Sequence, residues 1–327
     1  MYLNHTRCRA CGCEDLKPAF DLGLKPLAND FRKAGEPRAG YAPLKVLFCP
    51  RCTLAQLSVV VDPRVLYGHY SYVTSPSDTM RKHFDALATG LETRRPLGNV
   101  LEIGSNDGTF LKHLRDNYSP GVSRVFGVDP ATNLVAVARE SGIESLTGFW
   151  GRENAAVVKG LMPIVDTVIA RHVFAHANDW EDFAKGLETV CNDRTTIAIE
   201  VPYVLDLLSG NAFDTIYHEH LSYVSVRAMH AALAGSGLIV KDILRFALHG
   251  GVLVFLIGRN NWCGKGDGVP MAQVVSNYIA NEDRNLSILA WQGMQARSGV
   301  LILELQREVR SLLEQGKKIC AYGASAK

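Results

Sequence analysis

The sequence of 327 residues contains no apolar run that approaches the roughly 18 residues of a membrane-spanning helix. Its N-terminus, MYLNHTRCRACG, lacks the apolar core of a secretory signal peptide. The formal net charge is only +2 and no basic tract is present, which argues against nucleic acid or an anionic membrane as a partner. We therefore expect a cytoplasmic protein with neither partner. The sequence leaves the oligomeric state open, with a monomer as the expectation.

Eight cysteines do not make a disulfide scaffold in a chain of this size in a reducing compartment, so their spacing is informative. Cys8 and Cys11 form one Cys-x-x-Cys turn, and Cys49 and Cys52 form a second. Two such pairs supply the four thiolates of a tetrahedral zinc site with no open position. The spacing predicts a structural Zn2+ in a zinc-binding domain over residues 1–66. Unrelated free thiols or a redox pair are the alternatives.

Residues 67–260 are predicted to form an α/β domain, because short apolar runs alternate with helical stretches from residue 99 onward. Five parallel strands followed by an antiparallel hairpin are the sheet of class I methyltransferases, which is Rossmann-like. The expected strands cover 99–104, 124–130, 144–149, 166–176, 195–203, 238–246 and 250–259, with a helix at 225–237.

The first predicted strand runs into a glycine loop of the form E-x-G-x-x-x-G, from Glu102 through Gly104 to Gly108. Gly104 permits a sharp turn, and Gly108 lets the next helix begin close to the strand. Asn106 and Asp107 lie where a dinucleotide would present its pyrophosphate to the helix N-terminus. A carboxylate repels that group, whereas the methyl donor S-adenosylmethionine carries positive charge and no phosphate.

The second predicted strand ends in Asp129 and Pro130, about 20 residues past the glycine loop. An acid at this position can accept hydrogen bonds from both ribose hydroxyls of an adenosine. Together with Glu102 and Asp107, it favours S-adenosylmethionine over a nicotinamide dinucleotide. We therefore expect all seven of these residues to bind the donor.

The segment TIYHEHLSY, residues 215–223, gathers titratable side chains after the fifth predicted strand. On its own it fits a catalytic cluster, a metal site or a polar loop. Ligands of a doubly wound sheet bind beyond the carboxyl ends of its strands. The position of this segment therefore favours Tyr217, His218, Glu219 and His220 as residues that meet a substrate beside the donor.

Several motifs together resemble one family along essentially the whole chain. They are the two Cys-x-x-Cys turns, VLEIGSNDG, HVFAH, EVPY, YHEHLSY, HGG and AYGASAK. The family is that of the zinc-containing sugar C-methyltransferases, which depend on S-adenosylmethionine. Its members act on nucleotide-linked keto-deoxysugars in antibiotic and surface-glycan pathways.

The resemblance implies that Tyr217, Glu219 and His220 surround the sugar and that His220 is the general base. It also implies that Tyr72, in the segment YSYVTSPS, lines the active site. The chemistry agrees, because a carbon beside a ketone must lose a proton before it can attack a methyl group. The expected substrate is a nucleotide-linked 4-keto-deoxysugar, methylated at C3.

Three other functions remain open from the sequence. The same sheet serves O- and N-methyltransferases, and a zinc-stabilised binding protein could keep the glycine loop without catalysis. A nicotinamide-dependent oxidoreductase is the third, disfavoured by the acidic loop.

The C-terminal part is predicted to be helical over 261–318. The final segment, ICAYGASAK at 319–327, reads as a strand and glycine turn. In the family this point begins a Rossmann-like domain that helps to hold the nucleotide sugar. We expect 319–327 to be the truncated start of such a domain.

Overall fold

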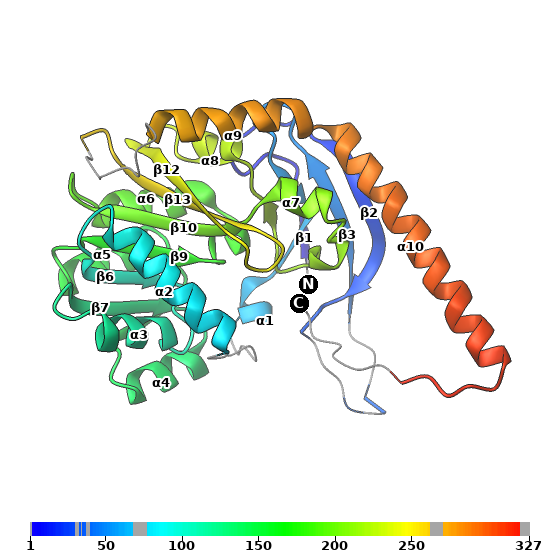
Figure 1. Cartoon of the computed structure of the whole chain (residues 1–327), viewed down its shortest axis with the longest axis horizontal. Coiled ribbons are helices and arrows are strands. Elements are labelled where there is room, and N and C mark those ends of the chain that lie inside the picture. The colour runs from blue at the N-terminus through cyan, green and yellow to red at the C-terminus, as the bar shows by residue number, and fades with distance from the viewer. Residues whose placement is uncertain are drawn as a thin grey trace.

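A seven-stranded sheet forms the centre of the computed structural model (Figure 1). The structure describes residues 2–29, 33, 35–36, 40–67, 77–261 and 271–320. The strand order is β12-β13-β10-β9-β6-β7-β8. These strands are β6 (Gly98–Ile103), β7 (Val122–Asp129), β8 (Ser145–Thr147), β9 (Thr167–Arg171), β10 (Thr196–Pro202), β12 (Leu238–Phe246) and β13 (Val252–Arg259).

The pairing confirms the predicted class I methyltransferase sheet. Strands β8, β7, β6, β9 and β10 are parallel to one another, whereas β13 runs antiparallel to β10 and to β12. The chain begins in the middle of the sheet at β6 and builds outward in both directions. This reversal of strand order leaves a crevice beyond the carboxyl ends of β6 and β9.

Alternate residues of the central strands belong to two hydrophobic cores, one on each face of the sheet. Val100 of β6 packs among α2, α3 and α4, whereas its neighbour Leu101 packs among α5 and α6. The helices around the sheet are α2 (Asp78–Glu92), α3 (Thr109–Asn117), α4 (Thr132–Glu140), α5 (Arg152–Leu161), α6 (Trp180–Val190), α7 (Val204–Ser209) and α8 (Val226–Ala232).

Two predicted elements differ most from the structure, and both are shorter than expected. The strand expected over 166–176 ends at Arg171, because His172 turns the backbone into the left-handed region (φ 53°). A 3-10 turn, Phe174–His176, follows. The helix expected over 225–237 covers only α8, and the next residues form turns at Gly235 and Gly237, both with positive φ.

The N-terminal part forms two small antiparallel sheets. One has the order β11-β4-β3-β2 and the other pairs β1 with β5. Their strands are β1 (Tyr2–Asn4), β2 (Lys17–Pro26), β3 (Tyr41–Phe48), β4 (Ala55–Leu57), β5 (Val59–Val61) and β11 (Ser222–Tyr223), with the short helix α1 (Pro63–Tyr67) after them. Strand β11 comes from far along the chain, so residues 215–223 are joined to the zinc-binding part by backbone pairing.

Helices α9 (Met271–Asn285) and α10 (Ile288–Glu314) lie within the range 261–318 that was expected to be helical. Figure 1 shows α10 as the long orange-red helix beside β2. Residues 319–320 have no regular structure, and the rest of the expected final strand lies outside the described residues. Within the described ranges, every helix is too short or too polar to cross a membrane.

Candidate active site

A cavity of about 800 Å³ opens at the carboxyl ends of the parallel strands. It is the crevice that the strand order predicts. Its wall combines the glycine loop, the ends of β7, β9 and β10, and the segment after α7. The lining residues used below are Gly104, Asn106, Asp129, Pro130, Arg171, His172, His176, Asn178, Tyr217, His220 and His249.

Asp129 is the last residue of β7 and stands in the cavity wall with 7% of its surface exposed. One carboxylate oxygen accepts the N–H of Asn106 at 2.8 Å, and the other accepts the N–H of Ala131 at 2.9 Å. Burial raises the pKa of Asp129 above its usual value, against these hydrogen bonds. The backbone thus holds both oxygens in place, which suits a carboxylate that binds a ribose diol.

The two loop glycines have distinct roles. At Gly104 φ is +69°, and a Cβ atom there would lie 2.9 Å from Val173. At Gly108 φ is +75°, and a Cβ atom would lie 3.2 Å from both Ala138 and Ile143. Gly104 therefore keeps the cavity wall open, whereas Gly108 lets α3 begin against α4.

Glu102 and Asp107 do not line the cavity, but they make contacts that hold residues of its wall. Glu102 is fully buried and accepts two hydrogen bonds from Arg171, at 2.7 and 2.9 Å. Burial raises the pKa of Glu102 to about 7, although Arg171 acts in the opposite direction. Asp107 accepts the N–H of Thr109 at 3.1 Å at the start of α3. Gly104, Asn106, Asp129 and Pro130 therefore line the cavity, whereas the two other acids and Gly108 shape it.

Tyr217 and His220 form a hydrogen-bonded pair in the same wall. The Nδ1 of His220 lies 2.8 Å from the carbonyl oxygen of Thr215. A carbonyl only accepts, so Nδ1 carries the hydrogen and Nε2 of the neutral ring is an acceptor. The hydroxyl of Tyr217 donates to that Nε2 at 2.9 Å. The structure therefore holds a proton-accepting nitrogen at the cavity.

His218 and Glu219 turn toward the zinc-binding part instead. Glu219 is 2% exposed and accepts a hydrogen bond from the amide of Asn29. The Nε2 of His218 lies 3.3 Å from the carbonyl of Ala42, and burial lowers the pKa of His218. Neither side chain is part of the cavity wall described above. Tyr72, the fourth predicted catalytic residue, lies outside the described residues.

His176 is a wall residue to which the sequence analysis gave no role. Its Nδ1 lies 2.9 Å from the hydroxyl of Tyr67, and its ring centroid is 5.0 Å from that of His220. The motif HVFAH was the available signal, since it follows a strand that ends at the same rim. A histidine at a strand end is too common to mark a site by itself.

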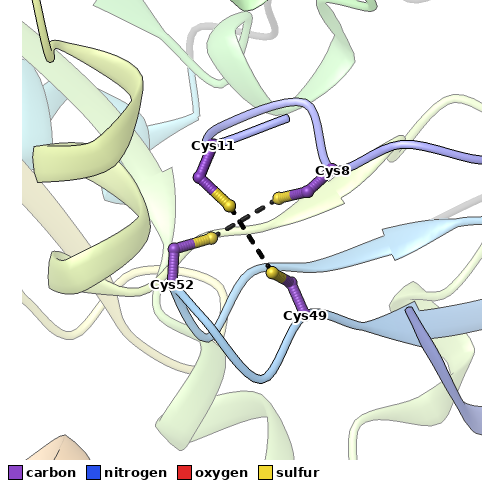
Figure 2. A group of neighbouring side chains, drawn as sticks. All are labelled: Cys8, Cys11, Cys49 and Cys52. Carbon is purple, nitrogen blue, oxygen red and sulfur yellow. Dashed lines mark hydrogen bonds between the residues drawn. The ribbon is translucent and has the colours of Figure 1, made fainter. Parts of the chain in front are cut away.

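The four predicted zinc ligands lie together on two facing turns of the N-terminal part (Figure 2). Their sulfur atoms all lie within 4.8 Å of one another, with Cys8 to Cys52 at 3.4 Å and Cys11 to Cys49 at 3.6 Å. Sulfur atoms around a tetrahedral Zn2+ are about 3.8 Å apart. The set therefore fits a closed structural zinc site.

The comparisons with known proteins agree with this architecture. Residues 8–67 match the family described as "Putative zinc binding domain", and residues 77–242 match "Methyltransferase domain". The C-methyltransferase NovU of Streptomyces niveus is 31% identical over 328 residues, which cover 98% of this chain and 76% of that protein.

Solved structures with a related fold include a SAM-dependent methyltransferase from Anabaena variabilis. It is 13% identical, covers 56% of this chain and 86% of its own, and has a TM-score of 0.44. The PH0226 protein of Pyrococcus horikoshii is 15% identical, covers 58% of this chain and 95% of its own, and also has a TM-score of 0.44. These two similarities carry no argument about function.

The sheet order and the matched domain define a class I methyltransferase that uses S-adenosylmethionine. Within that class, the chain belongs to the zinc-containing C-methyltransferase family that its motifs resemble. Its cofactors are S-adenosylmethionine and a structural zinc ion.

Proposed function

We propose that this enzyme methylates C3 of a nucleotide-linked 4-keto-deoxysugar through an enolate. One observation carries the proposal. The neutral acceptor nitrogen of His220 and the carboxylate of Asp129 share one cavity, so a proton acceptor and a ribose-binding group lie within reach of one bound pair of substrates. The relationship to a C-methyltransferase supports carbon as the acceptor atom.

S-adenosylmethionine, when bound, supplies a methyl group on a positively charged sulfur. We assign Asp129 to the ribose of this donor, and Gly104 and Asn106 to the loop that receives it. Arg171 lines the same wall, and its guanidinium is held by two hydrogen bonds to the buried Glu102.

We assign His220 the role of base. The electron pair of the C3–H bond becomes the carbon–carbon double bond of the enolate, and the carbonyl oxygen gains the negative charge. The proton goes to Nε2 of His220, whose orientation is set by Thr215 and Tyr217. The hydroxyl of Tyr217 keeps its own proton and can accept a hydrogen bond from Nε2 once that nitrogen is protonated. C3 then takes the methyl group, and the ketone forms again.

The roles of Glu219 and Tyr72 toward the sugar remain part of this proposal. Glu219 is held at Asn29 and so orders the segment that carries Tyr217 and His220. A hydrogen bond from Glu219 to a sugar hydroxyl would require this carboxylate to exchange partners.

We further propose a division into residues 1–66, 67–260 and 261–318, with 319–327 beginning a nucleotide-sugar-binding domain. We propose a cytoplasmic enzyme of antibiotic or surface-glycan biosynthesis that acts as a monomer. Four thiols gathered into one metal site are typical of a reducing compartment.

The test is to incubate the full chain with methyl-labelled donor and a panel of dTDP-, UDP- and GDP-linked 4-keto-deoxysugars. We expect a product with a new methyl group on C3 in its NMR spectrum. A methyl group on oxygen or nitrogen would contradict the proposal and identify the other type of methyltransferase.

A further inference from the structure

A second imidazole system, apart from the Tyr217–His220 pair, reaches the cavity wall through His172. Glu200 of β10 is 1% exposed, and each of its carboxylate oxygens faces a histidine. The Nε2 of His83, on α2, donates to Oε2 at 2.7 Å. The Nε2 of His172, at the end of β9, lies 2.9 Å from Oε1 in an ion-pair contact outside the ideal hydrogen-bond angle.

The two histidines are placed differently. His83 is buried, with 5% of its side chain exposed, and its ring packs edge-on against Phe246. His172 has 25% of its side chain exposed and lines the cavity. Strand β9 lies between β6, which carries the glycine loop, and β10. His172 therefore stands between the donor loop and the segment after β10 that carries His220.

The backbone at His172 is held in an unfavourable conformation. Its φ is +53°, a region that a residue with a Cβ atom rarely adopts. Its N–H donates to the backbone carbonyl of Glu200 at 2.9 Å, so main chain and side chain of Glu200 both fix it. Conformations of this kind cluster at functional sites, where the surrounding structure enforces them.

The charge of Glu200 must be balanced by the groups around it. A buried carboxylate is costly unless a cation compensates it. Arg171, which pairs with Glu200 from the neighbouring strand β9, makes its own ion pair with Glu102 at 2.7 Å. The other group facing His172 is His249, at a ring distance of 5.8 Å. Burial raises the pKa of Glu200, but the contacts with His172 and His83 outweigh it and hold this pKa well below its usual range. One extra proton on the two imidazoles makes the array neutral.

We propose that His172, positioned by Glu200 and His83, donates a hydrogen bond to the carbonyl oxygen of the methyl acceptor while His220 removes the proton from the adjacent carbon. The inference rests on the proposed function. As the C–H electron pair forms the enolate double bond, the carbonyl electron pair moves onto oxygen. A ring N–H of His172, not its backbone N–H, stabilises that charge. The N–H bond of His172 remains whole, and the charge leaves the oxygen when the methyl group is transferred. Glu200 and His83 act through His172 as positioning residues.

His172→Gly is the best variant, because glycine adopts φ +53° without strain and leaves space for free imidazole. With dTDP-4-keto-6-deoxyglucose as probe, we expect kcat to fall about 100-fold with a small change in KM. Added imidazole should restore about 10-fold of that loss, which a structural role would not allow. Glu200→Gln should lower kcat and weaken the rescue in the double variant.

His113→Asn is the matched control. His113 forms an imidazole–carboxylate contact of 2.9 Å with Asp85 on the surface, away from the cavity. We expect wild-type kcat in this variant. A wild-type kcat in His172→Gly would overturn the inference.

A second measurement needs no substrate and separates this inference from the proposed function. In the 15N NMR spectrum of histidine-labelled full chain at neutral pH, we expect a doubly protonated ring that disappears in His172→Gly. The same ring should lose a proton in Glu200→Gln and persist in His113→Asn. Absence of such a ring from the wild type would overturn the inference, even if the keto sugar is methylated. Failure of the wild type on every sugar, with this ring present, would refute the proposed substrate and leave the proton array established.

Discussion

At the scale of single residues, we expect donor binding to depend on Asp129. Its two oxygens already accept N–H groups from Asn106 and Ala131, so the carboxylate needs little reorganisation to bind a ribose. In Asp129→Asn an amide replaces a charged acceptor, and hydrogen bonds to charged groups contribute about 1.5–3 kcal/mol. We expect the Kd for S-adenosylmethionine to rise about 10- to 100-fold by calorimetry.

Asp116→Asn is the control for this change. Asp116 lies on the exposed surface of α3, where it pairs with Lys112 at 3.1 Å. Its substitution should leave the Kd unchanged. Equal donor affinity in Asp129→Asn and wild type would remove Asp129 from the donor site.

The hydroxyl of Tyr217 is a second test at this scale. It donates to Nε2 of His220 at 2.9 Å, and Tyr217→Phe keeps the ring while removing that donor. Because the orientation of the base is partly lost, we expect kcat to fall about 10- to 100-fold with donor affinity intact. Steady-state kinetics together with calorimetry check both parts. Tyr2→Phe, on the exposed strand β1, is the matched control and should leave kcat and donor affinity unchanged. Wild-type kcat in Tyr217→Phe would show that the hydrogen bond is dispensable.

At the scale of elements, backbone pairing joins the zinc-binding part to residues 215–223. Strand β4 begins shortly after Cys52 and pairs with β11. Only Leu221 separates His220 from the first residue of β11. Arg9, between two zinc ligands, donates to the carbonyl of Leu221 and to the side chain of Asn178, both at 3.3 Å. Asn178 is itself in the cavity wall. The zinc-binding part therefore contacts both the end of the segment 215–223 and the cavity wall.

Removal of zinc by a chelator should thus loosen residues 215–224 before the central sheet. Hydrogen–deuterium exchange measured by mass spectrometry should show faster exchange there and little change in β6 and β7. Cys11→Ser should reproduce the effect, whereas Cys13→Ser, a free thiol outside the ligand set, should not. Unchanged protection of 215–224 after metal loss would contradict this coupling.

The elements also show which parts of the structure the sequence can specify. The alternation of apolar runs and helices was enough for the sheet, because parallel strands joined by helices allow few topologies. The two-residue strand β11 has no such periodicity, and only its partner β4 defines it. For the same reason, the residues next to Glu219 in the sequence could not predict its contact with Asn29.

The candidate site was predictable to a similar degree. Asp129, Gly104 and the Tyr217–His220 pair follow from strand ends and motif spacing. The array of His83, Glu200 and His172 does not, because these residues come from α2, β10 and the end of β9 and meet only in the folded sheet. Sequence spacing carries no information about such contacts.

At the scale of the whole molecule, Glu200 makes stability depend on pH. Burial raises its pKa, yet the two histidines hold that pKa below the ordinary value of 4.5. A carboxylate of this kind stabilises the fold above pH 4.5, and the contribution is lost as the pH falls below that value. Urea unfolding of Glu200→Gln should therefore show a smaller drop in free energy of unfolding below pH 4.5 than wild type. Equal drops would indicate that Glu200 is not a buried anion.

The central claim is that His220 removes a proton from carbon before methyl transfer. The most direct measurement is NMR of dTDP-4-keto-6-deoxyglucose in D2O with the full chain and S-adenosylhomocysteine, which has no methyl group to transfer. We predict loss of the C3 proton signal with the wild-type enzyme and its retention with His220→Ala. Retention of that proton by the wild type, in a sample that methylates the same sugar when the donor is added, would contradict the account.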